Sequence, residues 1–307
     1  MFNHTDAKKR MNDIIETALS ALSIQEIKDK ISDFESLDPH LQYEDALEKI
    51  MNVILFEVGE LKVSAFKSEA REYKEGGIFY RVRKLKREIL VLKYSDFWEA
   101  PKEVIKRGRL NRPMEQLLYI SPKEYCTPIN ETHIKEGDPF LLIAYKAISP
   151  INVFGVGVGG NFEGGFTPET EKKLDIISDF IKRNFLKNSD TAYILSNVIG
   201  QEICKFDYDG WVYPSVAHEG GENLCLKLSS KDKLEIQSAY LCELVDKKVK
   251  FTHAIRVVNE IHIFNDWDSN DSDARKILDG LKGFNKHSGS EIETRNDIGY
   301  PINIITP

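Results

Sequence analysis

The sequence is poor in cysteine and lacks the spacings that bind metal ions or form redox disulfides. Its four cysteines, which stand far apart without a C-x-x-C pair or a histidine at zinc-finger spacing, are Cys126, Cys204, Cys225 and Cys242. Isolated cysteines of this kind are typical of buried, reduced thiols. We therefore expect no metal site.

Long apolar runs are also missing. No segment approaches the roughly 18 uninterrupted apolar residues that a membrane-spanning helix needs. The amino-terminal residues do not contain the apolar stretch of a signal peptide. We therefore expect a cytoplasmic protein that does not enter a membrane.

Basic residues are outnumbered by acidic ones. The chain has 42 Lys and Arg against 49 Asp and Glu, which gives a formal net charge of -7. Nucleic acids and anionic membranes are bound by broad basic surfaces. Direct binding to either is therefore not expected, and any phosphate group would need a local cationic pocket.

The first part of the chain has the apolar periodicity of amphipathic helices. This pattern predicts helix over residues 6–60, interrupted by Ser36–Pro39, and it ends where Gly76 and Gly77 follow Glu75. We predict a helical amino-terminal module over residues 1–75 and a second domain, with a carboxy-terminal tail, over 76–307. The module acts either as a structural brace or as a surface for a partner or a second copy of the chain.

Strand and helix signals mix unevenly after this boundary. A threonine cap followed by proline and glutamate predicts a helix that begins at Thr167 and runs to about Phe185, and a second helix is expected near 193–205. Strands are expected at 78–82, 117–120, 140–145, 211–213, 249–257 and 260–264. This mixture predicts an α+β fold.

Three clusters of polar and aromatic residues stand out in this second part. They are Phe79-Tyr80-Arg81, then Gly108-Arg109-Leu110-Asn111 followed by Tyr119 and Glu131, and finally Tyr213-Pro214-Ser215 followed by Gly220, Gly221, Glu222 and Asn223. In order and spacing they resemble the RES domain, a family named for an arginine, a glutamate and a serine. Its small bacterial members are toxins that destroy NAD.

The resemblance covers roughly residues 78 to 265. It implies a mixed β core related to ADP-ribosyltransferases, NAD as the substrate, and an antitoxin partner that carries a Xre-type helix-turn-helix. Small toxins of the family lack a helical preface such as residues 1–75. The chain could therefore be a larger defence effector whose helices sense a trigger.

The resemblance also implies roles for individual residues. It marks Arg81, Tyr119, Glu131 and Ser215 as catalytic, and Arg109 and Asn223 as NAD-binding. Two guanidinium groups suit a pyrophosphate, because each can donate two parallel hydrogen bonds. In the family the glutamate lies at the start of a helix, and a carboxylate beside the ribose can stabilise the positive charge that develops as nicotinamide leaves.

The residues around the predicted glutamate have weaker signals. Ser215 is not part of a G-x-S-x-G motif, so we expect it to orient the substrate or Glu131 and not to act as a nucleophile. His218 is interpreted as a surface residue of a loop. The G-x-G-x-x-G run from Gly155 to Gly160 is interpreted as a loop, because no helix opens at its third glycine.

Three functions stay open at this point. The enzyme could split NAD by hydrolysis or phosphorolysis, or it could transfer ADP-ribose to a protein, because the same bond is cleaved in each case. The domain could also be a catalytically silent binding module.

Overall fold

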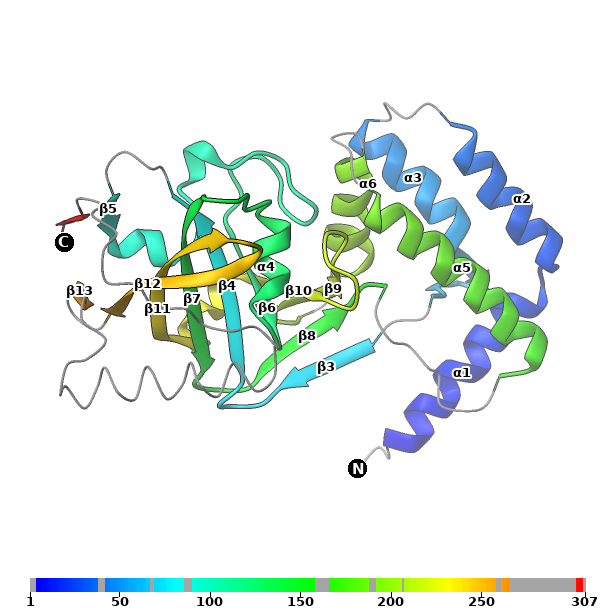
Figure 1. Cartoon of the computed structure of the whole chain (residues 1–307). Helices are drawn as coiled ribbons and strands as arrows, with labels where there is room; N and C mark the ends of the chain where they lie inside the picture. Colours follow the sequence, from blue (N-terminus) through cyan, green and yellow to red (C-terminus); the bar gives the residue numbers. More distant parts are fainter. Residues whose placement is uncertain are drawn as a thin grey trace. The chain divides into compact units, whose positions relative to one another are not determined.

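A computed structural model describes the chain over residues 4–37, 42–66, 69–85, 90–157, 166–187, 192–205, 207–257, 261–264 and 302–305 (Figure 1). The chain forms two compact units, and each combines segments that are far apart in the sequence. The first unit contains Met1–Arg71, Ile105–Glu115 and Val153–Pro214, and the second contains Glu72–Val104, Gln116–Asn152 and Ser215–Pro307.

The first unit is mainly helical (Figure 1). Its helices are α1 (His4–Ser20), α2 (Ile24–Glu35), α3 (Tyr43–Ile54), α5 (Pro168–Leu186) and α6 (Ala192–Val198), which continues as a π-helical turn at Ile199–Ile203. The side chain of Thr167 accepts a hydrogen bond from the backbone N–H of Thr170, so the predicted cap of α5 is confirmed. Ser23 and Glu26 form a capping box at the start of α2.

The apolar faces of the first three helices are covered by later helices of the same unit. α2 packs on α3 and α5, and α3 packs on α6. Phe34 of α2 meets Phe180 of α5 edge to face, with ring centroids 5.0 Å apart. The buried Lys173 of α5 donates to the backbone oxygen of Leu19, 3.0 Å away, near the end of α1. The predicted module of residues 1–75 thus contributes three helices to a larger helical assembly, and the domain boundary near Gly76 stays a prediction.

The helix prediction is wrong for residues 55–60. Two short strands, β1 (Leu55–Val58) and β2 (Leu61–Ser64), pair antiparallel there. Gly59 adopts a φ of 61° between them, in the left-handed region that glycine occupies without a steric penalty. α3 has already ended at Ile54, and the backbone is extended from Leu55 onward. The unit also contains β9 (Gly210–Pro214), which pairs in parallel with β8 (Ile151–Gly155).

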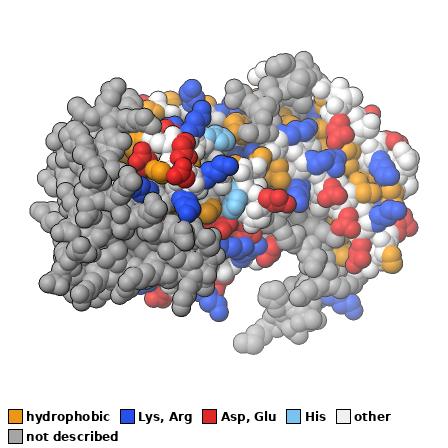
Figure 2. Space-filling view, viewed as in Figure 1, with side chains coloured by type: hydrophobic (Ala, Val, Ile, Leu, Met, Phe, Trp, Pro, Cys, Tyr) orange, Lys and Arg blue, Asp and Glu red, His pale blue; other side chains and the backbone are white. Residues whose placement is uncertain are grey.

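Charged residues of both signs intermingle on the surface of the helical unit in the space-filling view (Figure 2). On this face, the described side chains of the unit form no broad patch of one sign. The distribution agrees with the small negative net charge of the sequence. It provides no extended basic surface on this face for a polyanion.

The second unit is built on a largely antiparallel sheet. The hydrogen-bonded order of its strands is β13-β12-β11-β7-β4-β6-β10. These strands span β4 (Ile78–Lys84), β6 (Leu117–Pro122), β7 (Pro139–Ala147), β10 (Glu222–Lys227), β11 (Leu234–Val245), β12 (Lys248–Val257) and β13 (Ile261–Phe264). Three short helical segments, η1 (Tyr94–Phe97), η2 (Lys102–Val104) and η4 (Leu228–Lys233), connect them, together with the helix α4 (Cys126–Glu131).

Three further strands complete the described structure. β3 (Glu69–Tyr73) spans the boundary between the two units in the sequence, and β5 (Leu90–Lys93) pairs in parallel with β14 (Ile302–Ile305). Every strand that the sequence predicts is present within about two residues of its expected ends. The predicted α+β class is confirmed.

All four cysteines are free. Cys204, Cys225 and Cys242 are buried and Cys126 is half-buried, as expected for reduced thiols. No helix in the described part of the chain is long and apolar enough to cross a membrane.

The packing of α2 on α5 yields a stability prediction. Phe34→Ala should lower the free energy of unfolding by about 3 kcal/mol, because it removes a buried aromatic ring and leaves a cavity. Ser32→Ala, on the exposed side of the same helix, should change it by less than about 0.5 kcal/mol. Urea denaturation of the two variants measures both values. Equal stabilities would contradict the packing described for α2.

Candidate functional site

Glu131 lies at the end of α4, not at the start of a helix as the resemblance implies. Pro128 is the third residue of this helix. A proline is tolerated in the first turn of a helix, where its missing N–H is not needed, and α4 begins at Cys126. α4 has six residues and ends at Glu131, whose side chain is half-buried.

One oxygen of the Glu131 carboxylate is held by two side chains from other segments. Ser215 Oγ donates to Glu131 Oε1 at 2.6 Å, and Asn223 Nδ2 donates to the same atom at 2.7 Å. Hydrogen bonds to an ionised carboxylate are shorter and stronger than those between neutral groups. Oε2 of Glu131 has no hydrogen-bond partner among the described residues, so a ligand could reach it without displacing these contacts.

The side chain of Asn223 is held in turn by a residue of the neighbouring strand. Ser121 of β6 donates through Oγ to Asn223 Oδ1 at 3.3 Å, which directs the amide nitrogen toward Glu131. The register that pairs Leu224 with Ile120 sets Asn223 opposite Ser121. Both residues are buried. Because Tyr119 lies two residues from Ser121 on the same strand, its side chain faces the same side of the sheet.

Arg81 faces the other side of the sheet. Its neighbours in β4 are Tyr80 and Val82. They belong to a hydrophobic core that also contains Ile129 of α4 and Tyr125, the residue just before α4. Side chains alternate along a strand, so Arg81 points away from α4. The structure therefore does not bring Arg81 to Glu131.

On that other face, Arg81 lies beside the hydroxyl of Tyr145. Burial raises the pKa of Tyr145 to about 12, against the opposing effect of the Arg81 charge. The Tyr145 hydroxyl donates to the backbone oxygen of Phe97. Arg81 Nη1 is buried without a hydrogen-bond partner in the described part of the chain.

Arg109 belongs to the first unit and closes the end of a helix there. Its Nη1 donates to the backbone oxygens of Phe185 and Lys187, the latter at 3.1 Å. The guanidinium carbon lies 5.7, 5.6 and 6.0 Å from the ring centroids of Phe185, Tyr193 and Tyr213. The last carbonyls of a helix lack partners within the helix, so Arg109 stabilises the carboxy-terminal end of α5.

The segment around Arg109 is held by α6 and its π-helical turn. Asn197 Nδ2 donates to the backbone oxygens of Gly108 and Arg109, at 2.7 and 3.0 Å. A Cβ added to Gly200 would lie 2.2 Å from a methyl carbon of Leu110. A side chain at residue 200 would therefore have to displace the Leu110 side chain, so the turn packs closely on this segment.

Of the residues predicted to act together, the structure joins Glu131, Ser215 and Asn223, and it places Tyr119 on the same sheet face. Arg81 is on the opposite face, and Arg109 is part of the other unit. The roles predicted for the two arginines stay predictions. Sequence reasoning missed Ser121, whose only signal is its position two residues after Tyr119.

His218 lies in the loop between β9 and β10, as predicted, but it is only partly exposed. Its side chain is half-buried, with 28% exposed, and its ring lies against α4. The spacing of His218 from Ser215 indicates only the backbone contact, because a serine hydroxyl often accepts from a backbone N–H a few residues onward.

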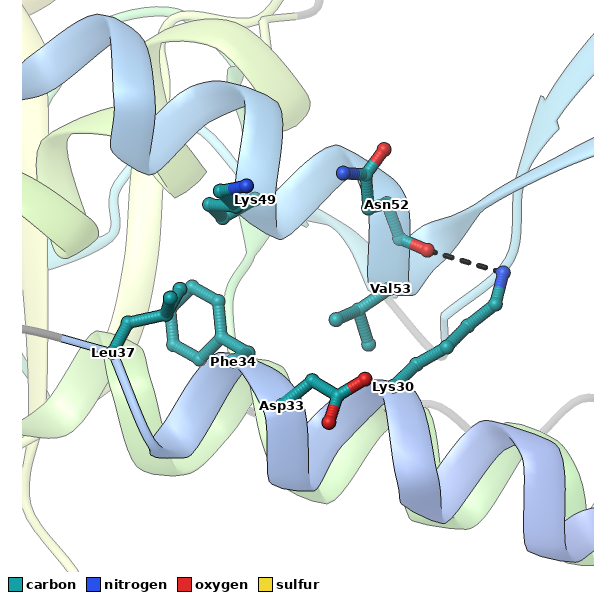
Figure 3. A pocket seen from close by; sticks show the side chains of 7 residues that line it. All are labelled: Lys30, Asp33, Phe34, Leu37, Lys49, Asn52 and Val53. Carbon is teal, nitrogen blue, oxygen red and sulfur yellow. Dashed lines mark hydrogen bonds between the residues drawn. The ribbon is translucent and has the colours of Figure 1, made fainter.

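A cavity of about 370 Å³ lies between α2 and α3 in the first unit (Figure 3). Its polar groups include Lys30, whose Nζ donates to the backbone oxygen of Asn52 at 3.2 Å, and Asp33. Both charge signs and apolar side chains line the cavity, without a set of groups that selects one ligand. It contains none of the predicted site residues.

The described residues contain no group of His, Cys, Asp and Glu side chains that could hold a metal ion. The second half of the G-x-G-x-x-G segment, residues 158–160, lies outside the described residues. Its interpretation as a loop is therefore untested.

No family model matches this sequence, and no curated protein matches it. The likeness to the RES domain therefore rests on the three residue clusters alone.

The position of Arg109 predicts a structural effect of its replacement. Arg109→Lys should lower the free energy of unfolding by about 2 kcal/mol, because lysine cannot reproduce the planar donor set against two carbonyls and three rings. Arg183→Lys, on the surface of α5, is the control and should cost less than about 0.5 kcal/mol. Urea denaturation measures both. A stable Arg109→Lys protein with reduced NAD affinity would instead favour the binding role.

Proposed function

We propose that this protein cleaves NAD at the bond between nicotinamide and ribose, with Glu131 as the catalytic carboxylate. The observation that supports the proposal is the arrangement around Glu131. Ser215 and Asn223 hold one of its oxygens, and the other has no partner among the described residues. The carboxylate is thus fixed in place and still able to contact a ligand.

The chemistry of the reaction needs a group of this kind. As nicotinamide leaves, positive charge develops on the ribose, and a preorganised carboxylate stabilises it without having to reorient. A carboxylate can also accept a hydrogen bond from a ribose hydroxyl. One such group typically contributes about 10²- to 10³-fold to the rate.

The arginines contribute less support. Arg81 lies on the sheet face opposite Glu131, and Nη1 of Arg109 is already bonded to two backbone oxygens. The proposal therefore rests on Glu131 and not on a guanidinium contact to the pyrophosphate. Tyr119 is half-buried on the face that carries the Glu131 cluster. It matches the tyrosine that faces the nicotinamide side of the pocket in the RES domain, so we assign it that contact.

The resemblance to the RES domain also suggests a cellular role for this activity. NAD loss would make the protein a toxin or defence effector, restrained by an antitoxin of the Xre type. The helical unit would then sense a trigger or bind the partner.

Incubation of the purified protein with NAD separates the candidate functions. Free nicotinamide with ADP-ribose indicates hydrolysis, and ADP-ribose-1''-phosphate in phosphate buffer indicates phosphorolysis. Labelled protein indicates ADP-ribosyl transfer. Unchanged NAD leaves a binding module as the remaining function.

Glu131→Gln tests the assigned residue. The substitution is nearly isosteric and removes the charge, so NAD consumption should fall at least about 10²-fold while the thermal unfolding temperature stays close to that of the wild type. The matched control is Glu103→Gln, which neutralises an exposed carboxylate of the same unit and should keep full activity. Glu131→Gln protein that retains more than half the wild-type rate would refute the assignment.

A further inference from the structure

The loop from Ser215 to Gly221 is fastened to α4 by the side chain of His218. His218 Nδ1 lies 2.9 Å from Thr127 Oγ1 and 3.4 Å from Glu124 Oε1. Thr127 is fully buried in α4, four residues before Glu131. The same helix thus carries both the carboxylate and the group that holds the loop.

The loop approaches α4 too closely for a side chain at its last residue. A Cβ added to Gly221 would lie 2.5 Å from Thr127 Oγ1 and 2.8 Å from His218 Nδ1. Real Cβ atoms do not approach other atoms so closely. Backbone hydrogen bonds close the loop, from Ser215 N–H to the oxygen of Gly221 at 2.8 Å and from Gly221 N–H to the oxygen of His218 at 3.1 Å.

This attachment determines what the Ser215 hydroxyl can do. The backbone N–H of His218 donates to Ser215 Oγ at 2.9 Å. An ionised carboxylate can only accept, so the hydroxyl proton points to Glu131. Movement of His218 away from α4 would shift the N–H that orients Ser215, and with it the hydrogen bond to Glu131.

We propose that His218 and Thr127 are positioning residues, which latch the Ser215–Gly221 loop to α4 and so hold the Ser215 hydroxyl on Glu131. The inference rests on the proposed function only in treating Glu131 as the reacting carboxylate. Neither residue is assigned a contact with the substrate. Their effect passes through Ser215, and it should appear in kcat more than in KM.

Thr127→Val and Thr127→Ser form the matched pair that tests the latch. Valine keeps the shape of threonine and removes the hydroxyl, whereas serine keeps the hydroxyl. For NAD cleavage, Thr127→Val should lower kcat about 10-fold with KM within about twofold of wild type, since small displacements of a catalytic group are costly. Thr127→Ser should stay within about twofold of the wild-type kcat.

A second substitution distinguishes positioning from a general structural effect. In a Ser215→Ala background, Thr127→Val and His218→Phe should cause no further loss of kcat, because the residue through which they act is gone. Losses that multiply in this background would overturn the proposed route through Ser215.

Amide hydrogen exchange tests the latch without NAD. The His218 and Gly221 amides should exchange at least about 10-fold faster in Thr127→Val and His218→Phe than in the wild type, and at the wild-type rate in Thr127→Ser. Unchanged exchange in Thr127→Val would overturn the latch. Faster exchange in a protein that leaves NAD intact would support the latch and refute the proposed function, so the two failures are distinguishable.

Discussion

A carboxylate that is partly removed from water needs hydrogen-bond donors, and in this protein that need joins three segments around Glu131. α4 supplies the carboxylate, the loop after β9 supplies the Ser215 hydroxyl, and β10 supplies the Asn223 amide. Removing one donor would leave the charge less well compensated, which costs more than the hydrogen bond itself contributes. The short helix, the loop and the sheet are therefore constrained together.

The same carboxylate connects the fold to the proposed chemistry. Ser215 and Asn223 both donate to Oε1 of Glu131, and Oε2 has no partner among the described residues. Oε2 can therefore still accept a hydrogen bond from a ligand. A group held in this way needs no reorganisation when charge develops nearby, which is the property that makes electrostatic stabilisation effective. The proposed latch of His218 and Thr127 would act on Glu131 indirectly, because it positions the Ser215 hydroxyl that bonds the carboxylate.

The two arginines show why a family pattern does not fix a site. In sequence, Arg81 and Arg109 look alike as candidates for a pyrophosphate. In the structure, Arg81 lies beside Tyr145 on the face away from α4, and Arg109 bonds the carbonyls that end α5. A guanidinium group suits a helix terminus and an aromatic cluster as well as it suits a phosphate, so residue type alone does not distinguish these roles.

Local patterns in the sequence were sufficient for most of the elements. The cap at Thr167 predicted the start of α5 because a threonine hydroxyl satisfies a free N–H of the first turn, whatever surrounds it. The change from helix to strand after Ile54 was missed because Val58 and Leu61 continue the apolar spacing of α3, whereas the pairing of β1 with β2 is not visible in that spacing. The convergence of Glu131, Ser215 and Asn223 was expected by resemblance, but which of them touch was decided only by tertiary structure. Strand register and alternation determine which side chains share a face, and these depend on partners that are distant in the sequence.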